Sequence, residues 1–453
     1  MPATEIQNAA AALAPYFADF ERFQRERHPA ATEPAFVQAL RRAGLERFSA
    51  LGFPDTRQEE WRLTNVAPIV QGSFHRAVGD PNAVGPEQIA AYDFPAAARL
   101  VFVDGRFSTR LSSLAGTPAL PAGMVVTSLA EALASTPGLV EPWLGQLAGF
   151  EQQPFVALNT AFLGDGAFIH VPRGVASGLI HVLFLSSSED GRATVSYPRN
   201  LFVASESSQL TVVETYAGTG AYFNCPVTEL VAGPNAVVDH YKVQRESREA
   251  FHVATFQVQG ERNSVPRSHS ISLGGGLVRN DVNAVLAGEG IDCILNGLYL
   301  VDGRQHLDNH MRVEHAKPHC ASHELYKGVL DGKARAVFNG LIHVHKGAQK
   351  TDAKQSNRNL LLSRDAIANS NPQLEIYADD VKCTHGSTVG QLDEDAVFYL
   401  RSRGIGQEAA RSLLTWAFAS DIVERIQVEP VRRDLEEFLF ARLPKGEVVR
   451  QAV

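Results

Sequence analysis

Hydrophobic positions near the N-terminus recur at helical intervals. Residues 7–27 (QNAAAALAPYFADFERFQRER) and 33–52 (EPAFVQALRRAGLERFSALG) both carry apolar residues every three or four positions. This spacing predicts two amphipathic helices, and Gly52 is placed to cap the second. Farther on, AARLVFVDGRF at 97–107 has two apolar runs around an Asp-Gly pair, which predicts a hairpin. We therefore expect a helical and mixed N-terminal domain over residues 1–153.

The pattern changes at about residue 154 to short runs typical of strands. Runs rich in Val, Ile, Phe and Thr alternate with Gly, Asn and Asp, as in LFVASESSQLTVVETYAG at 201–218 and FHVATFQVQG at 251–260. Helix signals are almost absent until the sequence changes again at about residue 391. This pattern is typical of a sandwich, a large barrel or a β-solenoid.

An internal repeat favours the solenoid. The segment LNGLYLVDGRQHLDNH at 295–310 matches FNGLIHVHKGAQKTDAK at 338–354 when one residue is inserted, and 43 residues separate Asn296 from Asn339. Self-similarity at a fixed period indicates stacked supersecondary units. We interpret the offset as two turns of a parallel β-helix, with Asn-Gly and Asp-Gly pairs at its corners. The predicted β-helix core spans residues 154–391.

The last part of the chain predicts a helical domain over residues 392–453. The segment DEDAVFYLRSRG begins at Asp393, a favourable N-cap, and ends at Gly404, a helix stop. Residues 406–426 and 431–443 continue with apolar side chains at helical spacing.

The apolar stripe on these helices has to pack inside the domain, on the end of the core, or on a partner. Phe398, Trp416 and Phe418 are candidate partner-binding residues. Packing inside the domain is the more frequent role for any single aromatic residue.

Composition restricts the class of protein. A chain of 453 residues suggests two or three domains, and 45% hydrophobic with 20% charged residues is typical of a globular protein. The net charge of −8 argues against a general nucleic-acid binder. No apolar run approaches the roughly 20 residues of a membrane span, and the N-terminus lacks the basic region of a signal peptide. Four scattered cysteines without a CxxC pair are typical of a reducing compartment, so we expect a cytoplasmic protein.

Several segments resemble functional motifs only superficially. In GVLDGKARA at 328–336, three residues separate the glycines and Ala334 follows Lys333, so the spacing and the hydroxyl of a P-loop are missing. We interpret this segment as a turn and expect no nucleotide site in this chain.

Histidines form two groups of candidate metal ligands. Between residues 306 and 323, strand signals and Pro318 argue against the helix that would align them for one metal ion. His343 and His345 share one face of a strand, but the sequence shows no third ligand. The alternative function that we keep open is therefore a metal-dependent β-barrel enzyme using this pair. The first group consists of His306, His310, His315, His319 and His323.

Cys383 and His385 are the strongest candidates for chemistry. At positions i and i+2 of a strand, both side chains face the same side. Lys382 and His385 could lower the pKa of the thiol and make the thiolate available as a metal ligand or nucleophile. The alternative is that Cys383 is a small buried residue.

Two segments resemble one known family. PQLEIYADDVKCTHGSTVGQLDEDAVFYLRSRGI at 372–405 closely resembles the signature of the SufB/SufD family of iron–sulfur cluster assembly proteins, and RQEEWRLTN at 57–65 resembles its N-terminal motif. The resemblance covers essentially the whole chain. The chain is shorter than a typical SufB and lacks its cysteine-bearing segments, so it is more similar to the SufD branch. The matching N-terminal positions are Arg57, Glu60, Trp61 and Thr64, and Leu63 stands where an aromatic residue is common.

The resemblance implies a fold and partners. It implies a mainly β protein with a right-handed parallel β-helix core, a helical or mixed N-terminal region and a C-terminal helical domain. A SufD-like chain would pair with SufB through the end of the β-helix, and its C-terminal helices would bind the ABC-type ATPase SufC. It would be a non-catalytic scaffold driven by ATP hydrolysis in SufC. The exposed end of the β-helix also predicts a homodimer when the chain is alone.

The resemblance also assigns a role to the Cys383 and His385 pair. The two residues carry over as those at the SufB interface implicated in nascent cluster assembly or iron entry. We expect a transient iron–sulfur cluster or iron there, and no permanently bound cofactor. A thiolate and an imidazole are too few to hold a cluster, so we expect half a site. The other cysteines match no site of the family and are expected to be structural: Cys225, Cys293 and Cys320.

Overall fold

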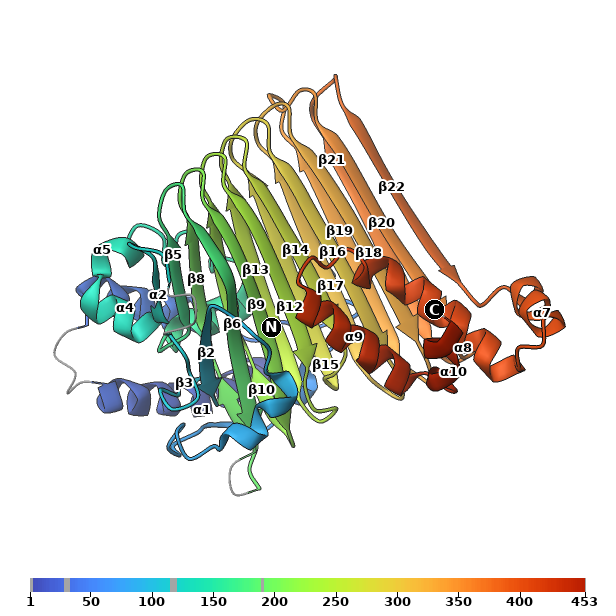
Figure 1. Ribbon diagram of the computed structural model, residues 1–453. Helices are drawn as coiled ribbons and strands as arrows, with labels where there is room; N and C mark the ends of the chain where they lie inside the picture. Colours follow the sequence, from blue (N-terminus) through green and yellow to red (C-terminus); the bar gives the residue numbers. More distant parts are fainter. Residues whose placement is uncertain (1–2, 28–32, 115–119, 189–190, 453) are drawn as a thin grey trace.

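Two long sheets face each other along the length of the molecule (Figure 1). The computed structural model describes residues 3–27, 33–114, 120–188 and 191–452. Successive coils place one strand in each sheet, and the paired strands of neighbouring coils are parallel. The core is a parallel β-solenoid of about eight turns with helices at both ends of the chain, which confirms the predicted fold class.

We call the 12-stranded sheet sheet A and the 10-stranded sheet sheet B. The main path of sheet A consists of β4 (Val125–Ser128), β5 (Ala167–Val171), β8 (Arg199–Ala204), β11 (Val227–Ala232), β13 (Phe251–Gly260), β15 (Leu277–Leu286), β17 (His306–His315), β19 (Arg335–Val344) and β21 (Ile367–Ile376). Beside it lie β1 (His75–Arg76), β7 (Thr194–Ser196) and β10 (Tyr222–Asn224). Sheet B consists of β3 (Arg106–Phe107), β2 (Ala98–Val103), β6 (Ala176–Ser187), β9 (Gln209–Thr219), β12 (Val237–Arg245), β14 (Val265–Ser272), β16 (Asp292–Val301), β18 (Ala321–Leu330), β20 (Asp352–Leu361) and β22 (Lys382–Gly390).

The helices lie before and after the solenoid in the sequence. The N-terminal ones are α1 (Ala3–Arg27), α2 (Ala35–Leu51), α3 (Ala67–Gln71), α4 (Leu129–Ser135), α5 (Pro137–Val140) and α6 (Pro154–Ala161), with short 3₁₀ turns η1 (Glu59–Trp61), η2 (Pro86–Gln88) and η3 (Ala90–Tyr92). The C-terminal ones are α7 (Glu394–Ser402), α8 (Gln407–Val423), α9 (Glu429–Arg442) and α10 (Gly446–Ala452). None of the helices described is long and apolar enough to cross a membrane.

Local sequence signals explain several boundaries. Gly52 caps α2 with a φ of 65°, as predicted. The side chain of Asp393 accepts hydrogen bonds from the first backbone N–H groups of α7, and the chain turns at Gly404 with a φ of 91°. The predicted hairpin is formed by β2 and β3, which are antiparallel. β2 and β4 lie in the N-terminal part of the chain but extend the two sheets of the solenoid.

Side chains that alternate along each strand build three apolar layers. Between the sheets, the lumen holds the largest cluster of buried side chains. Helices α1, α2 and α6 pack on the outer face of sheet A, where Phe48, Phe155 and Val253 meet. Helices α8 and α9 cover the outer face of sheet B, where Ile422 and Leu298 meet. Helices therefore cover part of both outer faces of the solenoid. Helices α8 and α9 leave the end that carries β21 and β22 uncovered (Figure 1).

The internal repeat has a different origin from the one predicted. Asn296 pairs with Leu325 in the next coil, so one coil takes 29 residues there, and the offset of 43 residues to Asn339 is about one and a half coils. Asn296 lies within β16 of sheet B and Asn339 within β19 of sheet A, so the prediction of two turns with Asn-Gly corners was wrong. The predicted Asp-Gly corners are confirmed at Gly303 and Gly332, which have φ values of 61° and 63°.

The glycines of the repeat make room inside the lumen. A Cβ atom on Gly297 would lie 2.2 Å from a ring atom of Tyr326, and one on Gly340 would lie 2.4 Å from the amide of Gln355. Each glycine therefore accepts a large side chain of a neighbouring strand. The two Asn-Gly pairs mark lumen packing rather than turns.

Gly297→Ala is expected to lower the free energy of unfolding by about 1–3 kcal/mol, because the new methyl group meets the Tyr326 ring in a packed core. Urea unfolding followed by circular dichroism measures this change. The control is Gly347→Ala, since a Cβ there meets no atom within 4 Å. Equal stability losses in the two variants would contradict the lumen-packing explanation.

Candidate functional site

Cys383 and His385 lie on β22, the terminal strand of sheet B at the open end of the solenoid (Figure 1). In the parallel register, Cys383 is opposite Ala353 and His385 is opposite Gln355 of β20. Cys383 packs partly against the last small apolar cluster of the lumen, so alternation places His385 on the same face. His385 is exposed because no further coil covers it. The structure therefore brings the two predicted residues together at an uncovered end.

The electrostatics of Cys383 differ from the expectation. Burial raises the pKa of the Cys383 thiol, a backbone hydrogen bond from Ala353 partly offsets this, and the Asp352 carboxylate raises it further. Lys382 is one position earlier, so its side chain points to the other face of the strand. The prediction of a lowered thiol pKa was wrong for the chain by itself. These contacts favour the neutral thiol in the chain by itself.

The pair has few possible ligands around it. In the part of the chain that the structure describes, no group of three or more His, Cys, Asp or Glu side chains is placed to hold a metal ion. An opening of about 460 Å³ lies beside His385 but does not reach Cys383, and it is lined in part by His323, Lys354 and Arg425. The arrangement can offer one thiolate and one imidazole, and further ligands have to come from another molecule.

His343 and His345 lie at the surface of sheet A, away from this pair in the fold. His343 Nδ1 is 2.8 Å from Glu375 Oε2, and His345 Nε2 is 2.6 Å from Glu314 Oε1. Each imidazole thus has a carboxylate partner of its own. The fold is a solenoid, so the β-barrel of the alternative interpretation was wrong.

The five histidines between residues 306 and 323 are dispersed, as their strand and turn signals suggested. His306 and His310 face the N-terminal segment, and His315 is buried with its Nε2 2.9 Å from Ser322 Oγ. His319 lies in a turn with a φ of 61°, and His323 lines the opening beside β22.

The N-terminal motif docks on these strands through buried charges. Arg279 lies over the Trp61 ring, 3.8 Å from its centroid, and donates to Asp308 at 2.8 Å and to the carbonyl oxygen of Glu60 at 2.7 Å. Thr64 Oγ1 donates to Asp308 at 2.6 Å. The motif therefore fastens the N-terminal segment to β15 and β17.

His310 belongs to the same cluster. Its Nε2 is 2.9 Å from Glu60 Oε2. Burial alone would lower the pKa of His310, but the carboxylates of Asp308, 3.7 Å from Nδ1, and Glu60 outweigh it and raise the pKa to about 9.

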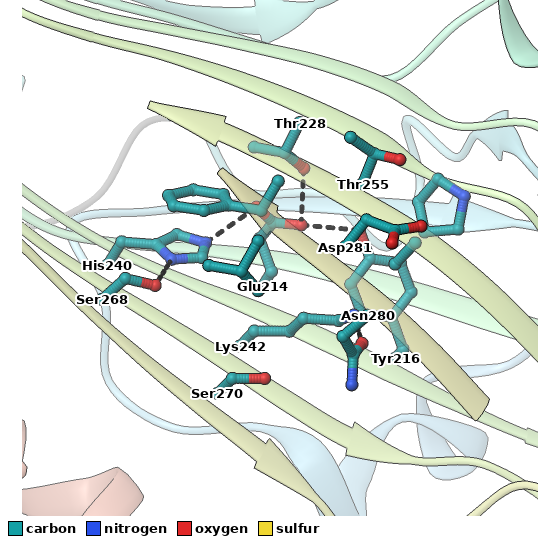
Figure 2. Close-up of a pocket in the computed structure, with 14 residues that line it drawn as sticks. Glu214, Tyr216, Thr228, His240, Lys242, Thr255, Ser268, Ser270, Asn280 and Asp281 are labelled. Atoms are coloured by element: carbon teal, nitrogen blue, oxygen red, sulfur yellow. Dashed lines mark hydrogen bonds and ion pairs between the residues drawn. The ribbon is translucent and has the colours of Figure 1, made fainter. Parts of the chain in front are cut away.

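A second polar cluster lies inside the lumen and was missed by the sequence reasoning (Figure 2). The Glu214 carboxylate accepts hydrogen bonds from Tyr216 at 2.6 Å and Thr228 at 3.1 Å, and lies 2.9 Å from His240 Nε2. The enclosed cavity measures about 20 Å³, the space of roughly one water molecule. The cluster is therefore a packed polar core and has no room for a substrate.

Lys242 supplies the cation of this cluster. Its Nζ donates to Asn280 Oδ1 at 2.7 Å. Burial lowers the pKa of Lys242 to about 8, although the carboxylates of Glu214, Glu246 and Asp281 oppose this. Glu214 and Tyr216 on β9, and His240 and Lys242 on β12, are each two residues apart and were the available signal, but the sequence does not show which strand face is inward.

The three aromatic candidates of the C-terminal domain differ in exposure. Phe398 on α7 is 69% exposed, beside the exposed Tyr399. Trp416 stacks on Phe440, and Phe418 packs against Lys327, whose Nζ is 4.5 Å from the ring centroid. Phe398 is the most open of the three.

The remaining cysteines are buried. Cys225 lies under the N-terminal helices, and Cys293 and Cys320 lie in the lumen cluster. Burial raises the pKa of each of these thiols, which makes them poor ligands and nucleophiles.

Comparisons with known proteins agree with these features. Residues 184–418 match the family model "SUF system FeS cluster assembly, SufBD core domain", and residues 16–178 match "SufBD protein N-terminal region". The chain therefore belongs to the SufBD family.

Full-length relatives narrow the similarity to one branch. The chain is 31% identical to "Iron-sulfur cluster assembly protein SufD" of Escherichia coli over 97% of this chain and 99% of the relative, and 27% identical to SufD of Bacillus subtilis over 89% and 93%. It is also 34% identical to a SufBD family protein of Synechocystis over 91% of this chain and 92% of the relative. These relatives confirm the predicted resemblance to SufD and imply a role in iron–sulfur cluster assembly.

Proposed function

We propose that the chain is the SufD-type scaffold subunit of a SufB–SufC–SufD complex that assembles iron–sulfur clusters. The observation that carries the proposal is the position of Cys383 and His385 on the terminal strand, at an end of the solenoid that no further strand of the described chain covers. We assign ATP hydrolysis to SufC and not to this subunit, since the P-loop-like segment at 328–336 consists of the end of β18, a turn and the start of β19. We place it in the cytoplasm because its four cysteines are free thiols, which suits a reducing compartment.

The open end offers a surface for SufB. Both sheets end there in strands with one free edge, β21 and β22, and the edge backbone groups can pair with a partner strand. The exposed apolar side chains at this end add a hydrophobic component, and they are Ile367, Ile376, Tyr377 and Val389. In the absence of SufB, the same end can pair two copies of this chain as a homodimer.

Iron or a nascent iron–sulfur cluster is the cargo of this interface. The Cys383 thiolate and the His385 imidazole suit iron, and SufB supplies the ligands that this chain lacks. The raised thiol pKa supports transient binding, because the ligand forms only when the cation and the partner are present.

The C-terminal helices are the proposed contact with SufC. Helix α7 projects beyond the solenoid and carries the exposed Phe398 (Figure 1). Trp416 and Phe418 contribute less surface because both pack within the chain. ATP hydrolysis in SufC then drives a change that reaches the solenoid through α8 and α9.

His385→Ala is expected to reduce cluster formation in the reconstituted complex about tenfold or more, because the variant removes a ligand of the shared site. Cluster formation is followed by absorbance, and assembly of the complex by gel filtration. The matched control is Thr384→Ala, an exposed residue on the opposite face of the same strand. If His385→Ala dissociates the complex, the residue is structural and the proposed site is wrong.

A further inference from the structure

Three side chains on lumen-facing strand positions form a row. The row ends at the pair of Cys383 and His385, which we call the half-site. Glu324 on β18 pairs in register with Gln355 on β20, and Gln355 with His385 on β22. Strands lie about 4.8 Å apart, so the row runs about 10 Å into the lumen behind His385. Glu324 and Gln355 are each only 3% exposed.

Glu324 and Gln355, the two inner residues of this row, have fewer hydrogen-bond donors near them than their oxygen atoms can accept. Gln355 Nε2 donates to Glu324 Oε2 at 2.8 Å, but the other carboxyl oxygen of Glu324 and the carbonyl oxygen of Gln355 are buried without a hydrogen-bond partner. Among the residues that the structure describes, no cationic side chain pairs with Glu324. Its charge raises the pKa values of the buried Cys293 and Tyr326, and the opening that Glu324 helps to line also carries His323, Lys354, His385 and Arg425.

A single proton satisfies both orphaned oxygens. If Glu324 carries a proton on Oε1, it can donate to Gln355 Oε1 while Gln355 donates back, which gives an acid–amide pair with two hydrogen bonds. Burial raises the pKa of Glu324 to about 7, and the bond from Gln355 opposes this only in part. Glu214 is equally buried, but hydrogen bonds from His240 and Tyr216 hold its pKa below the usual value.

We propose that Glu324 holds a proton in the free chain and releases it when Cys383 and His385 bind a cation, so that a buried carboxylate balances the charge of the occupied site. The inference rests on the proposed function. In the step, the Glu324 O–H bond and the Cys383 S–H bond break, bonds from the cation to Sγ and to the imidazole nitrogen form, and two protons pass to water. No electrons are transferred. Gln355 relays the change along the row because its amide contacts the carboxyl group directly.

The free chain provides the first test. Infrared difference spectra should show a protonated carboxylic acid that titrates with a midpoint near pH 7 and is absent from Glu324→Gln. Glu249→Gln, at an exposed position, is the control and should keep the band. Gln355→Met should shift the midpoint of the band, because the Glu324 carboxyl group loses its hydrogen-bonding partner. This second variant identifies the band even if Glu324→Gln does not fold. Absence of any such band above pH 6 in the wild-type chain would overturn the proposal.

The second test uses Co²⁺ as the probe in the complex with SufB and SufC. At pH 6, Glu324→Gln should release close to one proton fewer per bound Co²⁺ than the wild type, because nine-tenths of a group with a pKa of about 7 is protonated there. If Co²⁺ binds equally to wild type and His385→Ala, the proposed half-site fails. If binding requires His385 but the two proton counts agree, the half-site stands and the role of Glu324 is wrong.

Discussion

Arg279→Met is expected to lower the free energy of unfolding by about 3–5 kcal/mol and to release the N-terminal motif from the solenoid. Arg279 is 1% exposed and pairs with Asp281 at 2.9 Å and Asp308 at 2.8 Å. Removing the cation leaves two carboxylates in a buried site without their partner, which costs far more than the loss of a surface ion pair.

Methionine is chosen because it keeps the length of the side chain. It still packs on the Trp61 ring, so the lost interactions are the two ion pairs, the hydrogen bond to the Glu60 carbonyl oxygen and the attraction of the cation to the ring. Thr64 then donates to an Asp308 carboxylate that has lost Arg279 and keeps only the more distant contact with His310, whose Nδ1 is 3.7 Å away.

Urea unfolding measures the stability loss, and limited proteolysis at residues 57–65 measures release of the motif. Arg335→Met is the control, because Arg335 is exposed on β19 of the same sheet. The double variant Arg279→Met with Asp308→Asn should recover part of the loss, since it also removes one unpaired charge. If Arg279→Met and Arg335→Met lose the same stability and are cleaved equally at residues 57–65, the buried charges do not hold the motif on the solenoid.

Local patterns in the sequence predicted structural features well where each feature depends on a few neighbouring residues within one helix or hairpin. Caps at Gly52 and Asp393 and the hairpin at Asp104-Gly105 depend on a few neighbouring residues, and all three are confirmed. The number of residues per coil was harder to predict from the sequence, because the two Asn-Gly pairs that match in the repeat lie on opposite sheets. A better signal was the corner residues Asn235 and Asn263, 28 residues apart and both with a φ of 56°.

The candidate site could be predicted only where its residues are close in sequence. Cys383 and His385 share a strand face, so alternation alone brings them together. Glu214 and Asn280 come from strands of different sheets, and nothing in a single strand shows which face is the lumen. Burial of Cys383 by the last apolar cluster is equally invisible in the sequence, which is why the direction of its pKa was predicted wrongly.

Acidification from pH 7 to pH 5 is expected to lower the free energy of unfolding by about 4 kcal/mol. Burial lowers the pKa of His181 to about 3 and those of His269 and His315 to about 4. At pH 5 these imidazoles are neutral in the folded chain and protonated in the unfolded chain. The unfolded state then binds more protons, so stability falls with pH, by about 2 kcal/mol for each histidine.

Two other titratable groups affect the pH range over which the stability changes. The three histidines together would lower the free energy of unfolding by about 6 kcal/mol. Glu324, with its pKa raised to about 7, acts in the opposite direction, because it destabilises the folded chain more at pH 7 than at pH 5. It offsets about 2 kcal/mol of that loss. His310, with its pKa raised to about 9, is protonated in both states below pH 6 and its stabilising contribution is lost only as pH rises from about 6.5 through 9. The acid effect therefore comes from buried histidines, and His170, His252 and His306, whose pKa values burial also lowers, add to it in the same direction.

The environment of these histidines explains why none of them is charged. His181 stacks on Phe94 with ring centroids 4.2 Å apart, His269 stacks on Tyr241 at 5.1 Å, and His315 bonds to Ser322. Urea unfolding at pH 7, 6 and 5 measures the slope. His315→Gln should remove about 2 kcal/mol of the pH dependence. A stability that is flat between pH 7 and pH 5 would mean that these imidazoles accept protons inside the fold, and the lowered pKa values attributed to their burial would be wrong.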